Sequence, residues 1–369
     1  MTRKELNLAI FEGTADAVLW QPRLETWIWH HDHDKTMPPR FAGMSNLDIY
    51  DELRCSIRYE ACVGLDIYRE NEDEIVRTEE RHGDRVHEIV TTPAGSITTI
   101  HHEIWEDGEL VNRRIEKYPV TTPQDMRVAI DLTERLRCRP NLEKHLAAAE
   151  RVGHRAEPTM FLTSAGFTVL VKDWCGLENT FYLYADHPQI IEEYLEVCDR
   201  WDDRVLDAGL QLPARIFNLG DHATNEFTPP PILKKYMLPR WQRISARLHE
   251  NNRFVHSHWD GNSITMLPYL KESGLDAVEA LTPKPMGDMA LEDIKKAVGD
   301  EIICLDLIPA IHFMDQYTTQ EVLDFTKRVI DMFAPKLILG ISDEISEIGR
   351  IEKVEAISEL VDSICGLAS

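Results

Sequence analysis

Several common catalytic signatures are missing from this sequence of 369 residues. It contains no GxGxxG or GxxxxGK[ST] loop for nucleotide phosphates, no HExxH zinc motif and no GxSxG nucleophile elbow. These absences argue against nucleotide-driven and serine-hydrolase chemistry. They leave open the enzymes built on α/β barrels, which need none of these motifs.

Basic residues are scarce relative to acidic ones. Lysine and arginine number 40 and aspartate and glutamate 64, which gives a formal charge of −24. Such an acidic surface argues against duplex nucleic acid or an anionic membrane as the main partner. It fits a soluble enzyme acting on a small molecule, with room for a protein partner that has a basic rim.

Cysteines and long apolar runs are also limited. The seven cysteines are widely spaced, odd in number and form no CxxC pair, so we expect no disulfide framework and a reducing compartment. No run of about 18 apolar residues occurs, and the N-terminus has no apolar signal segment. We therefore expect a cytoplasmic protein without a membrane span.

Eight short apolar runs indicate strands, and from the third onward each precedes a segment with helical periodicity. Short continuous apolar runs are typical of buried parallel strands, and their alternation with helices predicts a (β/α)8 TIM barrel. We expect a single domain over 1–369. The expected strands are Ala17–Trp20, Leu65–Tyr68, Thr159–Thr163, Arg215–Leu219, Arg253–His258, Leu275–Leu281, Glu301–Ile308 and Leu337–Ser342.

The stretch from 73 to 120 departs from this pattern. Its residues alternate between polar and apolar, and turn signals stand at His82-Gly83-Asp84, Pro93-Ala94-Gly95 and Asp107-Gly108. This pattern predicts a β-meander inserted after the second strand.

Functional residues of such barrels lie at the C-terminal ends of the strands. The fifth strand ends in His256 and His258, which share one face, and Asp260 follows. Two imidazoles and a carboxylate are plausible metal ligands, although a structural role is the commoner outcome. In the sixth strand, Glu279 interrupts an apolar run, and a buried carboxylate needs a cation or a donor as partner.

Other strand ends offer further polar side chains. After the fourth strand, Asp221 and His222 could move protons or touch substrate, or stabilise the loop. After the eighth, Asp343 and Glu344 are adjacent, so we expect one of them to enter the barrel mouth. Cys304, in the seventh strand, is more typical of a core residue than of a ligand. Aromatic residues that could line a substrate pocket are Trp20, Trp27, Trp29, Trp174 and Trp259.

Several segments, in order, resemble the uroporphyrinogen decarboxylase-like superfamily, which includes corrinoid-linked methyltransferases. The opening TRKELNLAIFEGTADAVLWQPR is similar to the N-terminal helix and first strand of that superfamily, and TTPAGSITT to its insertion. SAGFT resembles its segment after strand 3, and DHATNEFTPPPILKKYMLPRW its strand-4 loop and helix. VHSHWDGN stands where its members carry HxCG or HxDG. The resemblance covers nearly the whole chain.

Departures from the family pattern narrow the expected activity. Uroporphyrinogen decarboxylases carry an arginine-rich motif near the first strand, where this chain has QPRLETW and Arg23 alone corresponds. The methyltransferase branch binds zinc through His-x-Cys on strand 5 and a cysteine on strand 8. Here His256 matches the histidine, His258 replaces the first cysteine, and strand 8 offers acids.

The resemblance therefore implies a zinc-dependent methyltransferase of the O-demethylase type, with a methoxylated aromatic donor and a corrinoid (cobalamin) protein as acceptor. Its implied metal ligands are His256, His258, Glu279 and Glu344, with Cys304, Asp260 and Asp343 open as replacements. His222 and Asp221 would be catalytic. Trp20, Arg23, Trp29 and Trp259 would bind substrate. A metal-independent decarboxylase or lyase, a methylcorrinoid:thiol methyltransferase, a non-catalytic binding protein and a homodimer stay open.

Overall fold

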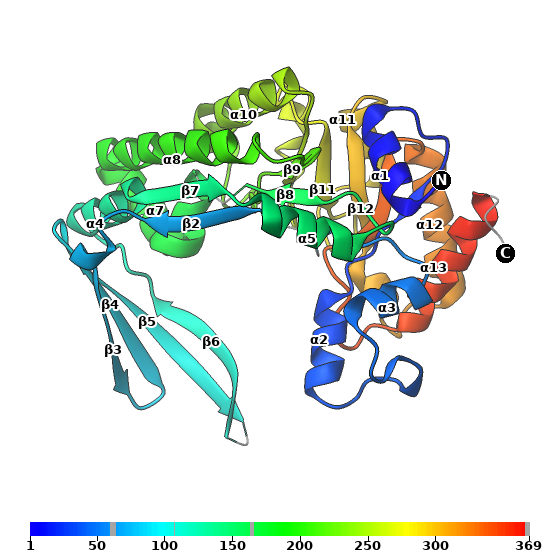
Figure 1. Cartoon of the computed structure of the whole chain (residues 1–369), viewed down its shortest axis with the longest axis horizontal. Helices are drawn as coiled ribbons and strands as arrows, with labels where there is room; N and C mark the ends of the chain where they lie inside the picture. Colours follow the sequence, from blue (N-terminus) through cyan, green and yellow to red (C-terminus); the bar gives the residue numbers. More distant parts are fainter. Residues whose placement is uncertain (60–63, 107, 163–165, 366–369) are drawn as a thin grey trace. The chain divides into compact units, whose positions relative to one another are not determined.

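The computed structural model describes residues 1–59, 64–106, 108–162 and 166–365 (Figure 1). Asp107, Thr163 and Ser164, which belong to an expected turn, an expected strand and the SAGFT segment, lie outside the described residues. The described chain forms two compact units. The first comprises 1–64, 141–162 and 212–369, and the second comprises 65–140 and 163–211. A single domain with an insertion at 73–120 stays a prediction.

A seven-stranded parallel sheet forms the centre of the first unit, in the order β1-β13-β12-β11-β10-β9-β8. This sheet confirms the prediction of a TIM-barrel-like α/β fold, with seven strands in the sheet rather than eight. The strands are β1 (Leu19–Trp20), β8 (Thr159–Phe161), β9 (Ile216–Asn218), β10 (Phe254–His258), β11 (Ala277–Leu281), β12 (Ile303–Pro309) and β13 (Leu337–Ser342).

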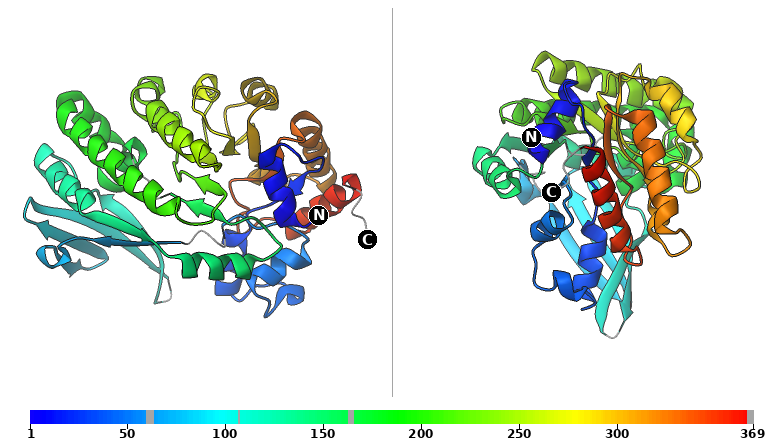
Figure 2. Two further views of the ribbon diagram at one scale, coloured as in Figure 1. Left: turned by 45° about the horizontal axis from the view of Figure 1, so that its top comes forward. Right: turned by 90° about the vertical axis from the view of Figure 1, so that its right-hand side faces the viewer.

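Continuous burial explains why these runs become central strands. Every residue of β12 and β13 is buried, as expected for parallel strands covered on both faces. Leu19, Ile216 and Ile338 belong to a core cluster that α1 covers with Leu6 and Ile10. Among the helices of this unit, α10 packs on β10, α12 on β12 and β13, and α13 on β1 (Figure 2).

The helices of the first unit begin with α1, which Thr2 and Glu5 cap reciprocally. They are α1 (Arg3–Glu12), α2 (Glu25–His33), α3 (Asn46–Glu52), α5 (Leu142–Val152), α9 (Pro230–Ile232), α10 (Leu238–Glu250), α11 (Leu291–Val298), α12 (Thr319–Phe333) and α13 (Ile351–Ile364), with short turns η1 (Pro39–Phe41), η4 (Leu233–Met237), η5 (Leu267–Tyr269) and η6 (Ala310–Phe313).

The second unit contains the second expected strand, β2 (Leu65–Arg69), which pairs antiparallel with β7 (Leu136–Pro140). Its expected place in the parallel sheet is therefore wrong. The physical reason is exposure: Ile67 and Tyr68 are about half exposed, whereas a central parallel strand is covered on both faces.

The expected meander is present in the second unit as a four-stranded antiparallel sheet (Figure 1). Its strands are β3 (Val76–His82), β4 (Arg85–Thr92), β5 (Gly95–Glu106) and β6 (Glu109–Lys117). Ile75, Ile97, Val128 and Leu132 form the core under it. The other elements of this unit are η2 (Glu72–Glu74), α4 (Pro123–Glu134), α6 (Phe167–Val169), η3 (Leu170–Trp174), α7 (Gly176–Asp186) and α8 (Pro188–Gly209). No helix within the described residues of either unit is long and apolar enough to cross a membrane.

Candidate active site

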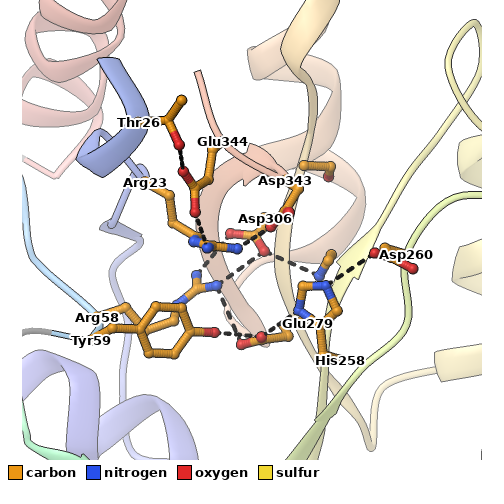
Figure 3. A network of polar contacts seen from close by, with 12 residues as sticks. Arg23, Thr26, Arg58, Tyr59, His258, Asp260, Glu279, Asp306, Asp343 and Glu344 are labelled. Carbon is orange, nitrogen blue, oxygen red and sulfur yellow. Dashed lines mark hydrogen bonds and ion pairs between the residues drawn. The ribbon is translucent and has the colours of Figure 1, made fainter. Parts of the chain in front are cut away.

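His258, the last residue of β10, lies beside Glu279 in the middle of β11. The two residues are direct partners in the register of the parallel strands. Nδ1 of His258 lies 2.7 Å from Oε1 of Glu279, and Nδ1 of His256 lies 3.2 Å from Oε2. Glu279 thus contacts both histidines of the expected pair from one buried position, and Figure 3 shows its contact with His258.

Arg58 and Tyr59, from the loop that follows α3, complete the surroundings of Glu279. The Tyr59 hydroxyl donates to Oε1 of Glu279, and Nη1 of Arg58 lies 3.4 Å from Oε2. Arg58 also donates to both carboxylate oxygens of Asp306, at 3.0 and 2.8 Å, and to the side-chain oxygen of Gln21 at 2.9 Å. The buried charges are therefore paired and hydrogen-bonded, as burial requires.

Backbone conformation supports the same cluster. Ala280 has a φ of 63° and Asp306 a φ of 83°, and neither residue is glycine. Asp306 accepts a hydrogen bond from the backbone nitrogen of Ala280 at 3.1 Å. Left-handed conformations of such residues cost free energy and concentrate at functional sites.

Arg23 is the centre of a second charged cluster in the same unit, where it binds two acidic residues. Its guanidinium donates to Asp343 and Glu344, and Thr26 donates to the other oxygen of Glu344 (Figure 3). Arg23 lies over one side of the Tyr59 ring, 5.0 Å from its centroid, and Arg58 lies 5.8 Å from that centroid. The ring of Phe161 packs against Tyr59 at 5.1 Å.

The charges shift the titration of the central groups. Burial alone would lower the pKa of His258, but its hydrogen bonds to Asp260 and Glu279 raise the pKa to about 10. Burial alone would raise the pKa of Glu279. Its contacts with His256 and His258 outweigh burial and hold this pKa well below its usual range. Burial and the Glu279 charge raise the pKa of Tyr59 far above its usual value, so its phenol remains a hydrogen-bond donor.

Three side chains could hold a metal ion. Within the described ranges, one group of three histidine, cysteine or acidic residues has its ligand atoms within 4.8 Å of one another: His222, His258 and Asp260. Oδ2 of Asp260 lies 3.4 Å from Nε2 of His258 and 3.9 Å from Nδ1 of His222. Ligand atoms around tetrahedral zinc lie about 3.3 Å apart, so this donor set fits a small divalent ion.

The environment of His258 also fits a metal ligand. Metal-binding histidines usually donate their second ring nitrogen to a carboxylate, and Glu279 stands at that nitrogen. The side chain of His222 is 43% exposed, whereas that of His258 is 7% exposed. The group is therefore open on one side, as catalytic metal sites are.

The other expected ligands and catalytic residues have different surroundings. Glu344 is bound to Arg23 and Thr26, and Asp343 to Arg23, so neither belongs to the group of three. Burial raises the pKa of the Cys304 thiol to about 12. Asp221 is fully buried and accepts from Arg240, Trp241 and Ser257.

The tryptophans expected to bind substrate do not share one environment. Trp259 is fully buried, with its ring 5.1 Å from that of Trp241. Trp29 is 58% exposed on α2 and stacks on His33. Trp20 is buried, and it points to the face of β1 opposite Leu19, which lies in the core cluster. Of the expected substrate residues, Arg23 alone joins the charged network.

Sequence reasoning missed Gln21, Arg58, Tyr59 and Phe161. Arg58 and Tyr59 stand in a loop rather than at a strand end, so the rule for strand ends could not find them. One signal was present in the sequence. Arg58 follows Cys55-Ser56-Ile57, a short run without charges, and an arginine that is buried together with such a run needs a charged or hydrogen-bonding partner.

A family model described as Uroporphyrinogen decarboxylase (URO-D) matches residues 108–364, well over half of the chain. The chain belongs to this family. No curated protein sequence matches the chain. The fold is similar to that of a methyltransferase from Methanosarcina mazei, at 12% identity and a TM-score of 0.57, with 99% of each chain covered.

A second similar structure is a B12-independent methionine synthase from Shewanella sp. W3-18-1, solved in complex with selenomethionine. The identity is 12% and the TM-score 0.45, over 95% of this chain and 98% of that one. Family membership supports an enzyme, and the likeness to the Methanosarcina mazei structure supports the fold.

Proposed function

We propose that this member of the family is a zinc-dependent methyltransferase that moves a methyl group from a methoxylated aromatic compound to a corrinoid protein. The observation that carries the proposal is the group of His222, His258 and Asp260 at the ends of the parallel strands, with Glu279 behind His258. His256 and Glu279, expected as ligands from the sequence, take supporting positions in this proposal.

The donor set suits the proposed chemistry. Two imidazoles and one carboxylate bind zinc and leave a coordination position open to solvent beside His222. A bound zinc ion would supply Lewis acidity toward the ether oxygen of the donor. A site without thiolates is less suited to activating a thiol, which disfavours the methylcorrinoid:thiol alternative.

The residues of the chain itself would hold the reactants. Glu279 fixes the orientation of the His258 ring through Nδ1, which leaves Nε2 for the metal. The aromatic pair Tyr59 and Phe161 adjoins Glu279 and could pack against an aromatic donor. The neutral Tyr59 phenol donates its one proton to Glu279, so its role toward the donor would be packing of the ring.

The charge balance favours a cation over a poly-acid substrate. The network contains the two guanidinium groups of Arg23 and Arg58, and both are already bound to carboxylates. A bound divalent cation would offset the excess of acids, whereas a substrate with several carboxylates would add to it. The carboxylates of the network are Asp260, Glu279, Asp306, Asp343 and Glu344.

A second candidate, a metal-independent decarboxylase or lyase, has one observation in its favour. Hydrogen bonds run from Tyr59 through Glu279 to His258, and a further contact reaches Asp260. Such a chain could deliver a proton to a carbanion left by loss of carbon dioxide.

The deciding experiment incubates the zinc-loaded protein with methoxyphenols and chemically reduced cobalamin, and follows methylcobalamin by its absorbance. We expect methyl transfer by the wild type and a loss of at least 100-fold in His258→Ala, with Glu301→Gln, an exposed position, as control. Release of carbon dioxide from carboxylated substrates by metal-free protein, without methyl transfer, would overturn the proposal in favour of the lyase.

A further inference from the structure

Asp288, in the loop after β11, joins three loops at the carboxyl end of the sheet. Its Oδ1 accepts hydrogen bonds from the backbone nitrogens of Ser263 and Ile264, at 3.1 and 3.2 Å. Its Oδ2 accepts from the side-chain nitrogen of Asn225 at 2.9 Å. Asp288 therefore contacts the loop after β9 and the loop after β10 at the same time.

These two loops carry His222 and Asp260 of the candidate metal group. His222 stands three residues before Asn225, and Asp260 stands three residues before Ser263. His258 differs from both because it lies within β10. The distance between His222 and Asp260 thus depends on how the two loops are held together. Beside these residues the backbones of Ala223 and Trp259 form a bridge, and farther along the loops Asp288 is bound to both.

Further contacts of Asn225 strengthen the same junction. Its backbone nitrogen donates to the carbonyl of Asn262 at 2.7 Å, and its side-chain oxygen accepts from the hydroxyl of Thr265 at 2.5 Å. Asn225 therefore crosses between the loops after β9 and β10, and Asp288 fixes the amide end of its side chain.

The loop that carries Asp288 is packed too closely to move easily. A Cβ atom on Gly287 would lie 1.9 Å from the carbonyl oxygen of Thr282 and 3.1 Å from that of Gly261. The backbone beside Asp288 therefore rests directly on the loop that holds Asp260. This packing gives the carboxylate of Asp288 a fixed position from which to hold the other loops.

We propose that Asp288 is a positioning residue for the metal site, which presets the separation of His222 and Asp260 without touching the ion. This inference rests on the proposed function, because it requires that His222, His258 and Asp260 bind a metal. Its physical basis is preorganisation: without Asp288, binding the ion would also have to order two loops, and that entropy would be taken from the binding free energy.

The test measures the affinity of the full-length apoprotein for Zn²⁺ by competition with a chelator, and the visible spectrum after addition of Co²⁺. We expect Asp288→Ala to bind zinc about 10- to 100-fold more weakly than the wild type, as removal of supporting groups around metal ligands usually does. The cobalt spectrum should change as well, because its ligand geometry loosens. Asp288→Asn keeps one acceptor oxygen, so its zinc affinity should lie between those of the wild type and Asp288→Ala.

Asp276 provides a matched control, because it stands just before β11, whereas Asp288 follows β11. Asp276 accepts hydrogen bonds from the backbone nitrogen of Val255 at 2.8 Å and from His249 at 3.0 Å, far along β10 from the metal group. Asp276→Ala removes a comparable set of bonds, so it should lower the melting temperature and leave the zinc affinity unchanged.

Two results would overturn the inference separately from the proposed function. Wild-type zinc affinity and cobalt spectrum in folded Asp288→Ala would remove the positioning role and leave the metal site intact. Equal losses of affinity in Asp288→Ala and Asp276→Ala would reduce the effect to general stability. A wild type that binds no Zn²⁺ would instead overturn the proposed metal site, and this inference with it.

Discussion

Glu279 accepts a hydrogen bond from Nδ1 of His258 at 2.7 Å, across two neighbouring parallel strands. This single contact links the buried charges around Glu279 to the partly exposed candidate metal ligands His222, His258 and Asp260. It also determines which nitrogen of His258 faces Asp260.

Replacement of Glu279 by glutamine should affect stability and metal binding together. The amide removes a negative charge that is buried against Arg58, His256 and His258. Loss of one partner from such a buried set costs about 3 kcal/mol of unfolding free energy, and zinc affinity should fall about 10- to 100-fold. Chemical denaturation and a zinc titration measure the two effects. An unchanged unfolding free energy would contradict the arrangement of charges described above.

Gly340 in β13 should not tolerate a side chain. A Cβ atom there would lie 2.3 Å from Oδ1 of Asp306 and 2.9 Å from the carbonyl oxygen of Gln21. Gly340→Ala should therefore displace Asp306 from Arg58 and destabilise the protein by about 2 kcal/mol. Ala277→Gly in β11 of the same sheet provides a control without added bulk. Denaturant unfolding checks this, and a variant as stable as the wild type would show that the contact can relax.

His312 should make stability depend on pH in mildly acidic solution. Burial, together with the charge of Lys353, lowers the pKa of His312 below its usual 6.5. The unfolded chain then binds the proton more readily than the folded one. The contribution of neutral His312 to the unfolding free energy is therefore fully present above pH 6.5, and it is lost as the pH falls through the pKa of His312 in the folded protein.

The measurement is a titration of the histidine ring signals by nuclear magnetic resonance, with His312→Phe to assign the signal. His312→Phe should also lose part of the decrease in unfolding free energy below pH 6.5, and its ring can pack on Tyr317 and Phe325. His249→Gln, at a 43% exposed position, is the control. A His312 signal that titrates at or above 6.5 would be inconsistent with this environment.

Lys353 should be important for the loop after β12. Its ammonium group donates to the carbonyl oxygens of His312, Met314 and Tyr317, at 3.0, 2.6 and 2.6 Å. Lys353→Met would leave these carbonyls without that donor and cost about 2 kcal/mol. Thermal unfolding of Lys353→Met beside the neighbouring Glu355→Gln tests this, and equal melting temperatures for the two would refute it.

The parallel strands could be predicted because their sequences are largely apolar. In β12 only Asp306 is charged, and β13 is apolar as far as Ser342. The run at Leu65–Tyr68 is too short to distinguish a buried parallel strand from a half-exposed antiparallel one. Asp66 separates its apolar residues, and alternation is typical of a half-exposed antiparallel strand. Pairing partners are non-local, so the sequence alone could not show that β7 lies beside it.

Part of the site could be predicted for the same reason. His258 ends β10, whereas His256 and Glu279 lie within β10 and β11, and the structure brings the three into contact. Asp260 and His222 lie in loops whose fold depends on distant residues such as Asp288, so their approach to His258 was beyond a rule for strands. Arg58 could not be placed because its carboxylate partners, Glu279 and Asp306, are more than 200 residues away in the sequence.

The central claim is that His222, His258 and Asp260 hold a divalent metal ion. The most direct test is elemental analysis of protein purified without chelators, for the wild type, His258→Ala, His222→Ala and the control Glu301→Gln. We predict about one zinc ion per chain in the wild type and the control, and its loss in both histidine variants while they remain folded. A folded wild type without metal, or full zinc content in both histidine variants, would contradict the account.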